Sequence, residues 1–227
     1  MAMMAKKGGG EGEEENIFWV TMSDLMLGLA CVFMTLFVLA MTGFTQTSVH
    51  QKQQQMEAVE ELADKLKEAD INAEVDKMTG DIKISDLELF EVNSWTLSKR
   101  GQEYLDKLVP IYVNTIFTKP ELDQNIANIV VQGHTDSQSF AGLSTKDEQF
   151  VRNMELSLKR ANSVAEYMFK TNFDKKHSAD LRHKLVVEGK SFTEPIMVNG
   201  KEDYAKSRRV ELKLKVNTWD IKNMLGF

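Results

Sequence analysis

The pattern of apolar residues divides the chain into one long unbroken run near the N-terminus and a larger region of short alternating or amphipathic segments. From residue 17 to residue 44 most positions are apolar, and Asp24 is the only side chain there that is charged at neutral pH. A helix rises about 1.5 Å per residue, so about 20 residues cross a hydrocarbon core about 30 Å thick. The pattern predicts a single transmembrane helix over residues 17–44.

Asp24 is the unusual residue of this run. An acidic side chain at the centre of a membrane helix costs about 2.5–3.5 kcal/mol on insertion scales, unless it faces protein or takes up a proton. Steps of three and four residues from Asp24 meet small or weakly polar side chains: Thr21, Gly28, Cys31, Thr35 and Thr42. Because small residues let a second helix approach closely, we expect this face to meet protein. The alternative is a tolerated carboxylate that snorkels or stays protonated.

The segments that flank the span are polar. Residues 1–16 combine lysines, a glycine run and glutamates, which is typical of a disordered tail. Lys6 and Lys7 precede the span, and no lysine or arginine follows it until Lys52, so the positive-inside rule favours a cytoplasmic N-terminus. The run is longer than the apolar part of a signal peptide, about 7–15 residues, which favours an uncleaved anchor in the inner membrane.

Residues 45–72 are predicted to form a helical linker. The segment begins polar and then places apolar residues at helical spacing from Met56 to Ala69. One hypothesis is a spacer or dimer coil between the membrane and a soluble domain, and the other is that residues 51–69 form a plug at the membrane surface in an inactive state.

Residues 73–227 alternate between strand and helix patterns. Strand-like runs at 73–77 and 81–87 flank Thr79 and Gly80, which suit a hairpin turn. Ser98 is a candidate N-cap for a helix, a second helix is predicted over 150–170, and strands are predicted at 126–132, 185–188 and 209–216. The order β, α, β, α, β with a closing strand predicts one α/β domain, an α+β sandwich.

Two motifs in this region resemble the peptidoglycan-binding signature of OmpA-like domains. The first is Gly133-His134-Thr135-Asp136, and the second runs from Asn153 through Leu156, Ser157, Arg160 and Ala161 to Val164. Further positions agree with the same family: Phe90, Leu97, Gly101, Gly189, Pro195, Asn199, Arg208, Arg209, Val210 and Glu211. The resemblance covers residues 73–216 and implies a βαβαβ domain that binds the cell wall.

The resemblance also implies a role for individual residues. In OmpA-like domains an aspartate and an arginine grip the diaminopimelate of the stem peptide, which by motif position implies Asp136 for its ammonium and Arg160 for its carboxylate. Thr135 and Asn153 would line the same pocket. This chain departs from the family in a longer loop over residues 137–152, which can cover or reshape the pocket, and in Ser207, where the family commonly has Asn.

The span and the domain together resemble the B subunits of the flagellar stator family, MotB and its relatives. Residues 19–26 are similar to the aromatic-x-x-x-x-Asp pattern of that family, and residues 23–29 resemble most the ZorB proteins of Zorya anti-phage systems. The resemblance implies a homodimer inside a pentamer of a larger MotA/ZorA-like membrane subunit, with ion passage at Asp24 driving rotation. Thr21 and Ser23 would line the ion path, and both H⁺ and Na⁺ stay open as the ion.

Composition and candidate catalytic residues narrow the function class. A formal net charge of -6 without a basic tract argues against a nucleic-acid binder, and the single cysteine forms no intrachain disulfide. His134 with Asp136, or His177 with His183, suggests a hydrolase, but four histidines without paired ligand spacing make that reading weak. Arg208 and Arg209 are expected to be surface residues of a final strand. We predict no enzyme, no metal site and no cofactor.

Two readings therefore remain for the whole chain. An ion-driven motor subunit explains both the intramembrane carboxylate and the wall-binding domain. Its output would be phage defence or flagellar motility. A passive OmpA-like anchor explains the domain and the span but gives no reason for Asp24. The predicted partners are a second copy of the chain, the pentameric membrane subunit, peptidoglycan and membrane lipid.

Overall fold

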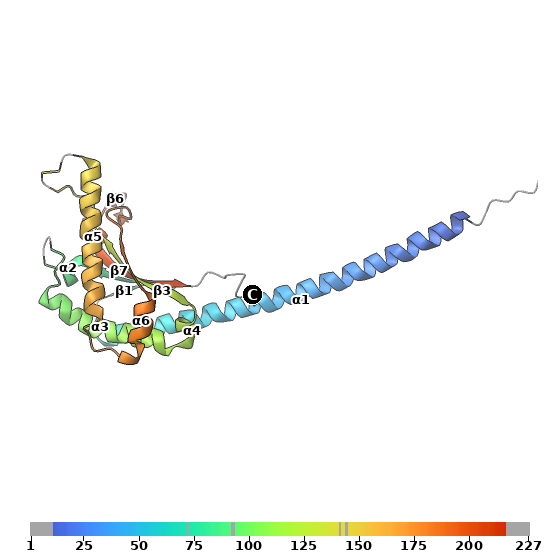
Figure 1. Cartoon of the computed structure of the whole chain (residues 1–227), viewed down its shortest axis with the longest axis horizontal. Coiled ribbons are helices and arrows are strands. Elements are labelled where there is room, and N and C mark those ends of the chain that lie inside the picture. The colour runs from blue at the N-terminus through green and yellow to red at the C-terminus, as the bar shows by residue number, and fades with distance from the viewer. Residues whose placement is uncertain (1–10, 72, 92–93, 141, 144, 217–227) are drawn as a thin grey trace, which may run out of the picture. The chain divides into compact units, whose positions relative to one another are not determined.

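Helix α1, Glu11–Glu68, is the longest element of the computed structural model and appears in blue to cyan in Figure 1. The structure describes residues 11–71, 73–91, 94–140, 142–143 and 145–216. Contacts divide the chain into two units, Met1–Lys52 and Gln53–Phe227.

The first unit contains the predicted span. Ile17–Gly43 is apolar enough, with a mean hydropathy of 2.4, and long enough to cross a membrane. Residues 11–16, which the sequence assigns to a disordered tail, are helical in the structure, and residues 1–10 lie outside the described residues. Extending a helix is easier than starting one, and glutamates are favourable at a helix N-terminus, which accounts for the longer helix.

The C-terminal end of α1 belongs to the second unit. Leu62 is fully buried and Leu66 is 1% exposed, and both lie in the hydrophobic core of that unit, with Ala58 and Ile71. The predicted linker of residues 45–72 is helical as far as Glu68, and its last turns pack into the hydrophobic core of the second unit. The spacer role stays a prediction. The plug hypothesis concerns another state of the protein and stays a prediction.

One mixed sheet organises the second unit. Its strand order is β1-β2-β7-β3-β4, where β3 and β4 are parallel and the other neighbours are antiparallel. The strands are β1 Glu74–Val75, β2 Ile82–Ser85, β3 Ile126–His134, β4 Leu185–Gly189 and β7 Arg209–Val216. Each predicted strand run overlaps one of these strands, and β3 and β4 extend two residues and one residue beyond their predicted ends. The predicted fold class, an N-terminal apolar helix followed by an α/β domain, is confirmed.

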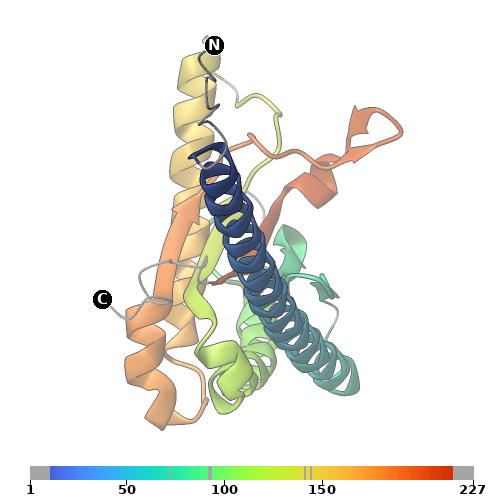
Figure 2. The same ribbon diagram turned by 90° about the vertical axis from the view of Figure 1, so that its right-hand side faces the viewer.

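Two long helices complete the core. Helix α3, Lys99–Thr118, begins at the predicted N-cap, where the Ser98 side chain accepts a hydrogen bond from Gly101 N. Helix α5, Lys146–Met168, lies along β3 and β4 (Figure 2). Inward residues of β3 and β7, such as Ile129, Val131 and Leu212, share one hydrophobic core with both helices. This packing fixes α5 against the ends of the two parallel strands.

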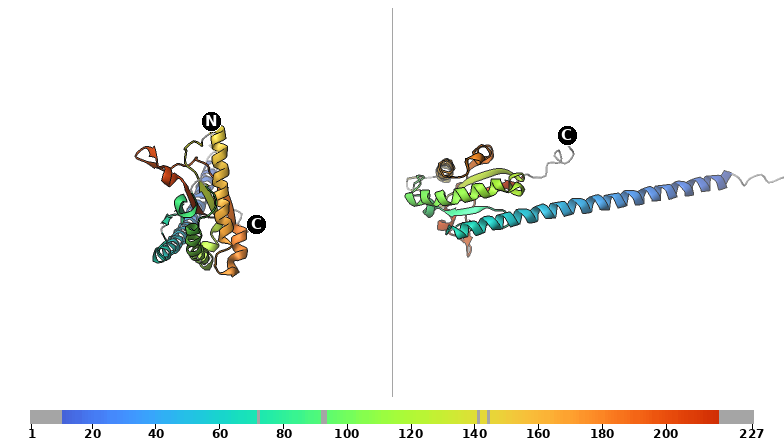
Figure 3. Two further views of the ribbon diagram at one scale, coloured as in Figure 1. Left: turned by 90° about the vertical axis from the view of Figure 1, so that its left-hand side faces the viewer. Right: turned by 90° about the horizontal axis from the view of Figure 1, so that it is seen from below.

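The structure adds short elements that the sequence pattern did not predict: α2 Asp86–Leu89, α4 Pro120–Asp123, η1 Lys175–His177, α6 Ser178–Lys184, α7 Tyr204–Ser207, β5 Met197–Val198 and β6 Lys201–Glu202. They are too short to show a periodicity. The β5–β6 hairpin projects from the rest of the unit, as Figures 2 and 3 both show. Helix α5 starts at Lys146, earlier than the predicted residue 150, because Thr145 and Glu148 form a capping box.

Candidate functional site

Glycines at the ends of β3 and β4 create the candidate ligand site of the second unit. A Cβ atom on Gly133 would lie 2.0 Å from the Ser157 carbonyl oxygen, and one on Gly189 would lie 2.9 Å from Leu158 N. Gly133 and Gly189 are paired in register, so both strands allow α5 to approach closely. As a result, the residues that follow β3 and the middle of α5 lie together.

Asp136 and Arg160, the two residues predicted to grip the ligand, are both buried at this place, 7% and 3% exposed. Each forms an ion pair with another residue. Arg160 Nη2 lies 3.0 Å from Asp86 Oδ2, and its Nε donates to the Ser94 carbonyl at 3.0 Å. Asp136 Oδ2 accepts a hydrogen bond from Arg208 Nη1. The site therefore contains two acidic and two basic side chains, of which the sequence motifs identified only half.

Burial controls the electrostatics of this four-residue cluster. Burial raises the pKa of Asp86, and Arg160 opposes that rise. Burial lowers the pKa of Arg160, and Asp86 opposes that fall. Asp136 and Arg208 also act on both groups, so the four charges form one electrostatic system. Removing one member of a buried ion pair costs about 3–5 kcal/mol, because its partner stays buried and uncompensated.

Two polar atoms at the site lack a hydrogen-bond partner within the described part of the chain. They are Thr135 Oγ1 and Arg160 Nη1. An unpaired buried polar atom costs about 1–3 kcal/mol, so a ligand that supplies partners for these atoms would stabilise the site. The Arg160 guanidinium carbon lies over the Phe90 ring, 5.3 Å from the ring centroid, and this contact also restrains the guanidinium. Arg160 is thus fixed in place while one of its donors stays available.

Thr135 and Asn153, the other two residues predicted to line the pocket, both bond the protein backbone. Thr135 is buried, and its backbone nitrogen donates to the Ser191 carbonyl at 2.9 Å. Asn153 is also buried, but its side-chain nitrogen donates to the Gln149 carbonyl of its own helix at 3.0 Å. The pocket roles of Thr135, Asp136, Asn153 and Arg160 stay predictions.

The expectation that Arg208 and Arg209 are surface residues was wrong for Arg209, whereas the Arg208 side chain is 29% exposed. Arg208 pairs with Asp136, as described above, and Arg209 is only 7% exposed. Arg209 Nε donates to Glu211 Oε1 at 2.5 Å. The partner of Arg208 lies 72 positions away in the sequence, and Arg209 also donates to the Glu194 carbonyl at 3.2 Å, so neither set of contacts follows from the local alternation.

The loop after Asp136 is attached to its surroundings at both ends. Ser137 N donates to Glu202 Oε1 of the β5–β6 hairpin at 3.1 Å. The Gln149 side chain of α5 bonds both the backbone nitrogen and the carbonyl of Phe140, at 2.8 and 3.1 Å. Part of the additional sequence in residues 137–152 thus lengthens α5, and the remainder forms an edge beside the site.

His134 does not form an acid–base pair with Asp136. Its Nε2 lies 3.0 Å from Gln132 Oε1 and 3.7 Å from Glu211 Oε2. Burial, with a further contribution from Arg209, lowers the pKa of His134 to about 3, so the ring is neutral at physiological pH. Within the described ranges, no group of three or more His, Cys, Asp or Glu side chains is arranged to hold a metal ion.

The predicted ion site lies in the first unit, where the side chains of the span are exposed. Thr21 Oγ1 donates to the carbonyls of Ile17 and Phe18 at 3.0 and 2.9 Å, and Ser23 Oγ donates to the Trp19 carbonyl at 2.8 Å. Both hydroxyl oxygens keep lone pairs for a cation or a proton donor. Asp24 lies on the same helix face as Thr21, three residues away.

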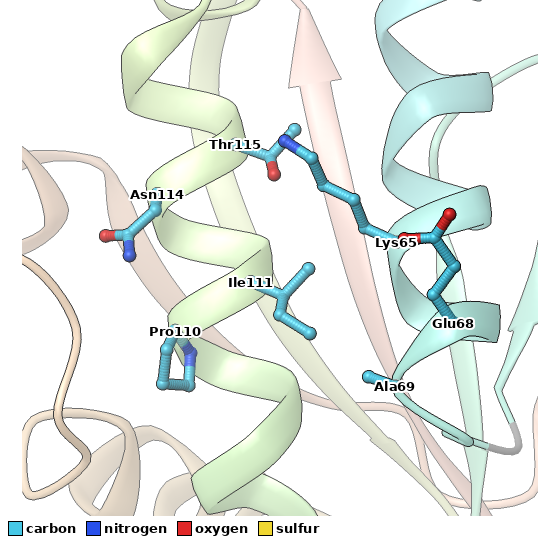
Figure 4. A pocket seen from close by; sticks show the side chains of 7 residues that line it. All are labelled: Lys65, Glu68, Ala69, Pro110, Ile111, Asn114 and Thr115. Carbon is cyan, nitrogen blue, oxygen red and sulfur yellow. The ribbon is translucent and has the colours of Figure 1, made fainter.

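A groove of about 420 Å³ lies between the end of α1 and α3 (Figure 4). Its lining residues are Lys65, Glu68, Ala69, Pro110, Ile111, Asn114 and Thr115. None of the predicted site residues lies there, and the Lys65 ammonium is paired with Glu61 at 2.8 Å. We assign no role to this groove.

Comparison with known proteins identifies relatives of both parts of the chain. Residues 89–210 match the OmpA family. Zorya protein ZorB of Escherichia coli strain Crooks is 29% identical over 218 residues, which cover 90% of each chain. ZorB of Escherichia coli O139:H28 is 24% identical over 216 residues, covering 89% of this chain and 82% of that one. The resemblance to OmpA-like and ZorB proteins that the sequence motifs predicted is confirmed.

A solved structure supports the fold. A MotB-like protein from Desulfovibrio vulgaris superposes with a TM-score of 0.52 at 19% identity, over 75% of this chain and 96% of that chain. None of these names refers to a catalytic activity.

Proposed function

The chain belongs to the OmpA family, and from this membership we propose that it is the B-type subunit of a membrane motor that the second unit anchors to peptidoglycan. The ZorB relatives, which align along both units, support a stator-type subunit over an isolated wall-binding domain. The observation that carries the wall-binding part is the buried cluster around Asp136 and Arg160, with its unpaired donor on Arg160.

The chemistry of the cluster suits a zwitterionic end group such as that of diaminopimelate. A carboxylate of the ligand would accept from Arg160 Nη1, the donor that the protein leaves unused. An ammonium of the ligand would approach Asp136, which holds the cationic Arg208 in the absence of ligand. The Thr135 hydroxyl, also without a partner in the described residues, would complete the hydrogen bonds.

Wall binding is tested by replacing Asp136 and Arg160 together with Ala. We expect the purified full chain to lose its co-sedimentation with sacculi, because both charged contacts to the ligand disappear. The matched control replaces Arg152 and Glu155, an exposed ion pair at 2.8 Å on the same helix, and should bind normally.

Removing buried charges can also destabilise the fold, so circular dichroism has to show that each variant is folded in the binding assay. Asp136→Asn with Arg160→Lys keeps the side-chain volumes and serves as a second variant. A folded double variant that still sediments with sacculi contradicts the assigned pocket.

For the membrane part we propose that Asp24 carries the ion, most simply a proton, past the moving partner. The face of small and weakly polar residues that runs through Asp24, with Thr21 and Gly28 on either side of it, supports this, because small residues let a partner helix approach closely. Two copies of the chain within a pentameric MotA/ZorA-like subunit would provide the surrounding helices. The ZorB names support phage defence as the output. A flagellar-type stator and a passive anchor are the alternatives.

The proposed location is the inner membrane, with residues 1–16 in the cytoplasm and the second unit in the periplasm. A reporter enzyme that is active only in the periplasm, fused after Phe227, is expected to be active, because the lysines before the span stay inside. The same fusion to a cytoplasm-dependent reporter is the control and should be silent. The reverse pattern would exclude contact between the second unit and the wall.

A further inference from the structure

Charges of the chain itself occupy the proposed peptide site. Asp86, the first residue of α2, lies 3.0 Å from Arg160 Nη2. Arg208, directly before β7, donates a hydrogen bond to Asp136 Oδ2. Asp86 thus provides a carboxylate where a zwitterionic ligand would place its own, and Arg208 provides a cation where the ligand would place its ammonium.

The contacts of Arg160 show what a ligand carboxylate has to compete for. A guanidinium binds a carboxylate most strongly through two parallel N–H groups. Arg160 Nε donates to the Ser94 carbonyl at 3.0 Å, and Nη2 is paired with Asp86. Nη1 is buried and lacks a partner in the described part of the chain. To bind through both terminal nitrogens, a ligand carboxylate has to compete with Asp86 for Nη2.

Asp136 is held in a similar way. Its Oδ1 accepts a hydrogen bond from Gln138 N at 3.1 Å, and its Oδ2 accepts from Arg208 Nη1. The Arg208 side chain is 29% exposed, whereas those of Asp136 and Asp86 are each 10% exposed. Arg208 is therefore the group that can turn toward solvent when a ligand ammonium takes its place at Asp136.

The two ion pairs act on each other. Burial raises the pKa of Asp86, Arg160 opposes that rise, and the charges of Arg208 and Asp136 also act on this carboxyl group. A ligand that binds both Arg160 and Asp136 leaves Asp86 and Arg208 as neighbours of opposite charge, which compensate each other. A ligand with one charge displaces only one of them and leaves it without its partner, which is costly for a buried group.

We propose that Asp86 and Arg208 determine the specificity of the site, as internal competitors that only a zwitterionic end group displaces as a pair. The proposal rests on the proposed wall-binding function. Asp136 and Arg160 provide the contacts to the ligand, and their internal partners select against end groups that carry a carboxylate alone or an ammonium alone. For such ligands the apparent affinity is lowered by the fraction of sites in which the internal pairs are formed.

The test measures binding of three diaminopimelate tripeptides to the detergent-solubilised full chain by isothermal titration. One has a free zwitterionic end, one has the carboxylate of that end as an amide, and one has the ammonium of that end acetylated. We expect Asp86→Asn to tighten binding of the acetylated peptide, which keeps its carboxylate, about tenfold and to leave the amidated peptide unchanged. Arg208→Gln should tighten the amidated peptide and leave the acetylated one unchanged.

Glu88→Gln and Lys206→Gln are the matched controls. Glu88 lies two residues after Asp86 in α2 and is paired with Arg100 at 2.7 Å. Lys206 is an exposed residue two positions before Arg208. Each control removes the same charge as the corresponding test variant, and neither should change the affinity for any of the three peptides.

Circular dichroism shows whether each variant is folded. If Asp86→Asn is not folded, the partly exposed Arg208 decides the question. Arg208→Lys is its second variant, which keeps the charge without the planar guanidinium and should give a smaller gain of the same kind. The proposal is excluded if folded Arg208 variants do not tighten the amidated peptide, or if folded Asp86→Asn does not tighten the acetylated one. If neither the wild-type chain nor any variant binds the zwitterionic peptide, the proposed wall-binding function itself is contradicted.

Discussion

Asp24→Asn is expected to give a protein that assembles and binds the wall but supports no phage protection. Asparagine has nearly the same shape, so helix packing around the face of Thr21 and Gly28 should persist. The amide does not gain and lose a proton or hold a cation as a carboxylate does, so the ion cycle stops. The efficiency of phage plating should rise to that of cells without the gene, and Asp24→Glu should retain partial protection.

The control for this experiment is Thr35→Val, a change of similar size on the same helix face. The Thr35 hydroxyl donates to the Val32 carbonyl of its own helix at 2.8 Å, and we assign it no role in ion passage. Co-purification with the membrane partner and sedimentation with sacculi show whether each variant assembles. Full phage protection by an assembled Asp24→Asn protein would exclude the motor and leave the passive anchor.

Gly133→Ala is expected to disrupt both the fold and the ligand site of the second unit. The new methyl group would lie 2.0 Å from the backbone oxygen of Ser157, which no side-chain rotation relieves. Helix α5 has to move, and it carries both Asn153 and Arg160. Overpacking of this kind costs about 1–3 kcal/mol, so we expect the melting temperature to fall by about 2–12 °C. Binding to sacculi should also be lost at temperatures at which the variant is still folded, because the shift of α5 moves residues of the site.

Gly43→Ala adds the same methyl group on α1, where it would meet no atom of the described residues within 4 Å apart from the adjoining helix backbone, and serves as the control. The thermal unfolding of the second unit should not change in this variant. If Gly133→Ala melts like the wild-type chain and binds sacculi normally, the close approach of α5 to β3 does not position the site.

Periodicity predicts those elements whose pattern of apolar and polar residues is regular along their length. The span is apolar throughout, and β7 alternates between the core and the other face of the sheet, so both are visible in the pattern. The end of α1 is different, because an apolar stripe such as that of Leu62 and Leu66 does not specify which surface it meets. The sequence therefore predicted the helix but not that its last turns are buried in the core.

The candidate site shows a similar division. Asp136 and Arg160 were predicted because they occupy motif positions, and the fold brings both to one place. Asp86 and Arg208, which pair with them, lie 74 and 72 positions away in the sequence, in a predicted strand run and before a predicted final strand. The signal that identifies them is tertiary, since a buried charge requires a partner and only the packed structure shows which residue supplies it.

The burial of the end of α1 determines where a fragment that contains the wall-binding unit has to begin. A fragment that follows the family match, residues 89–210, lacks Leu62 and Leu66 of α1 and Ile82 and Ile84 of β2, which are buried in the core. Such a fragment exposes the apolar surface that these residues cover and is prone to aggregate. A chimera that exchanges wall-binding units between motors should therefore place its junction near Gln53, so that the last turns of α1 are transplanted with the sheet they cover.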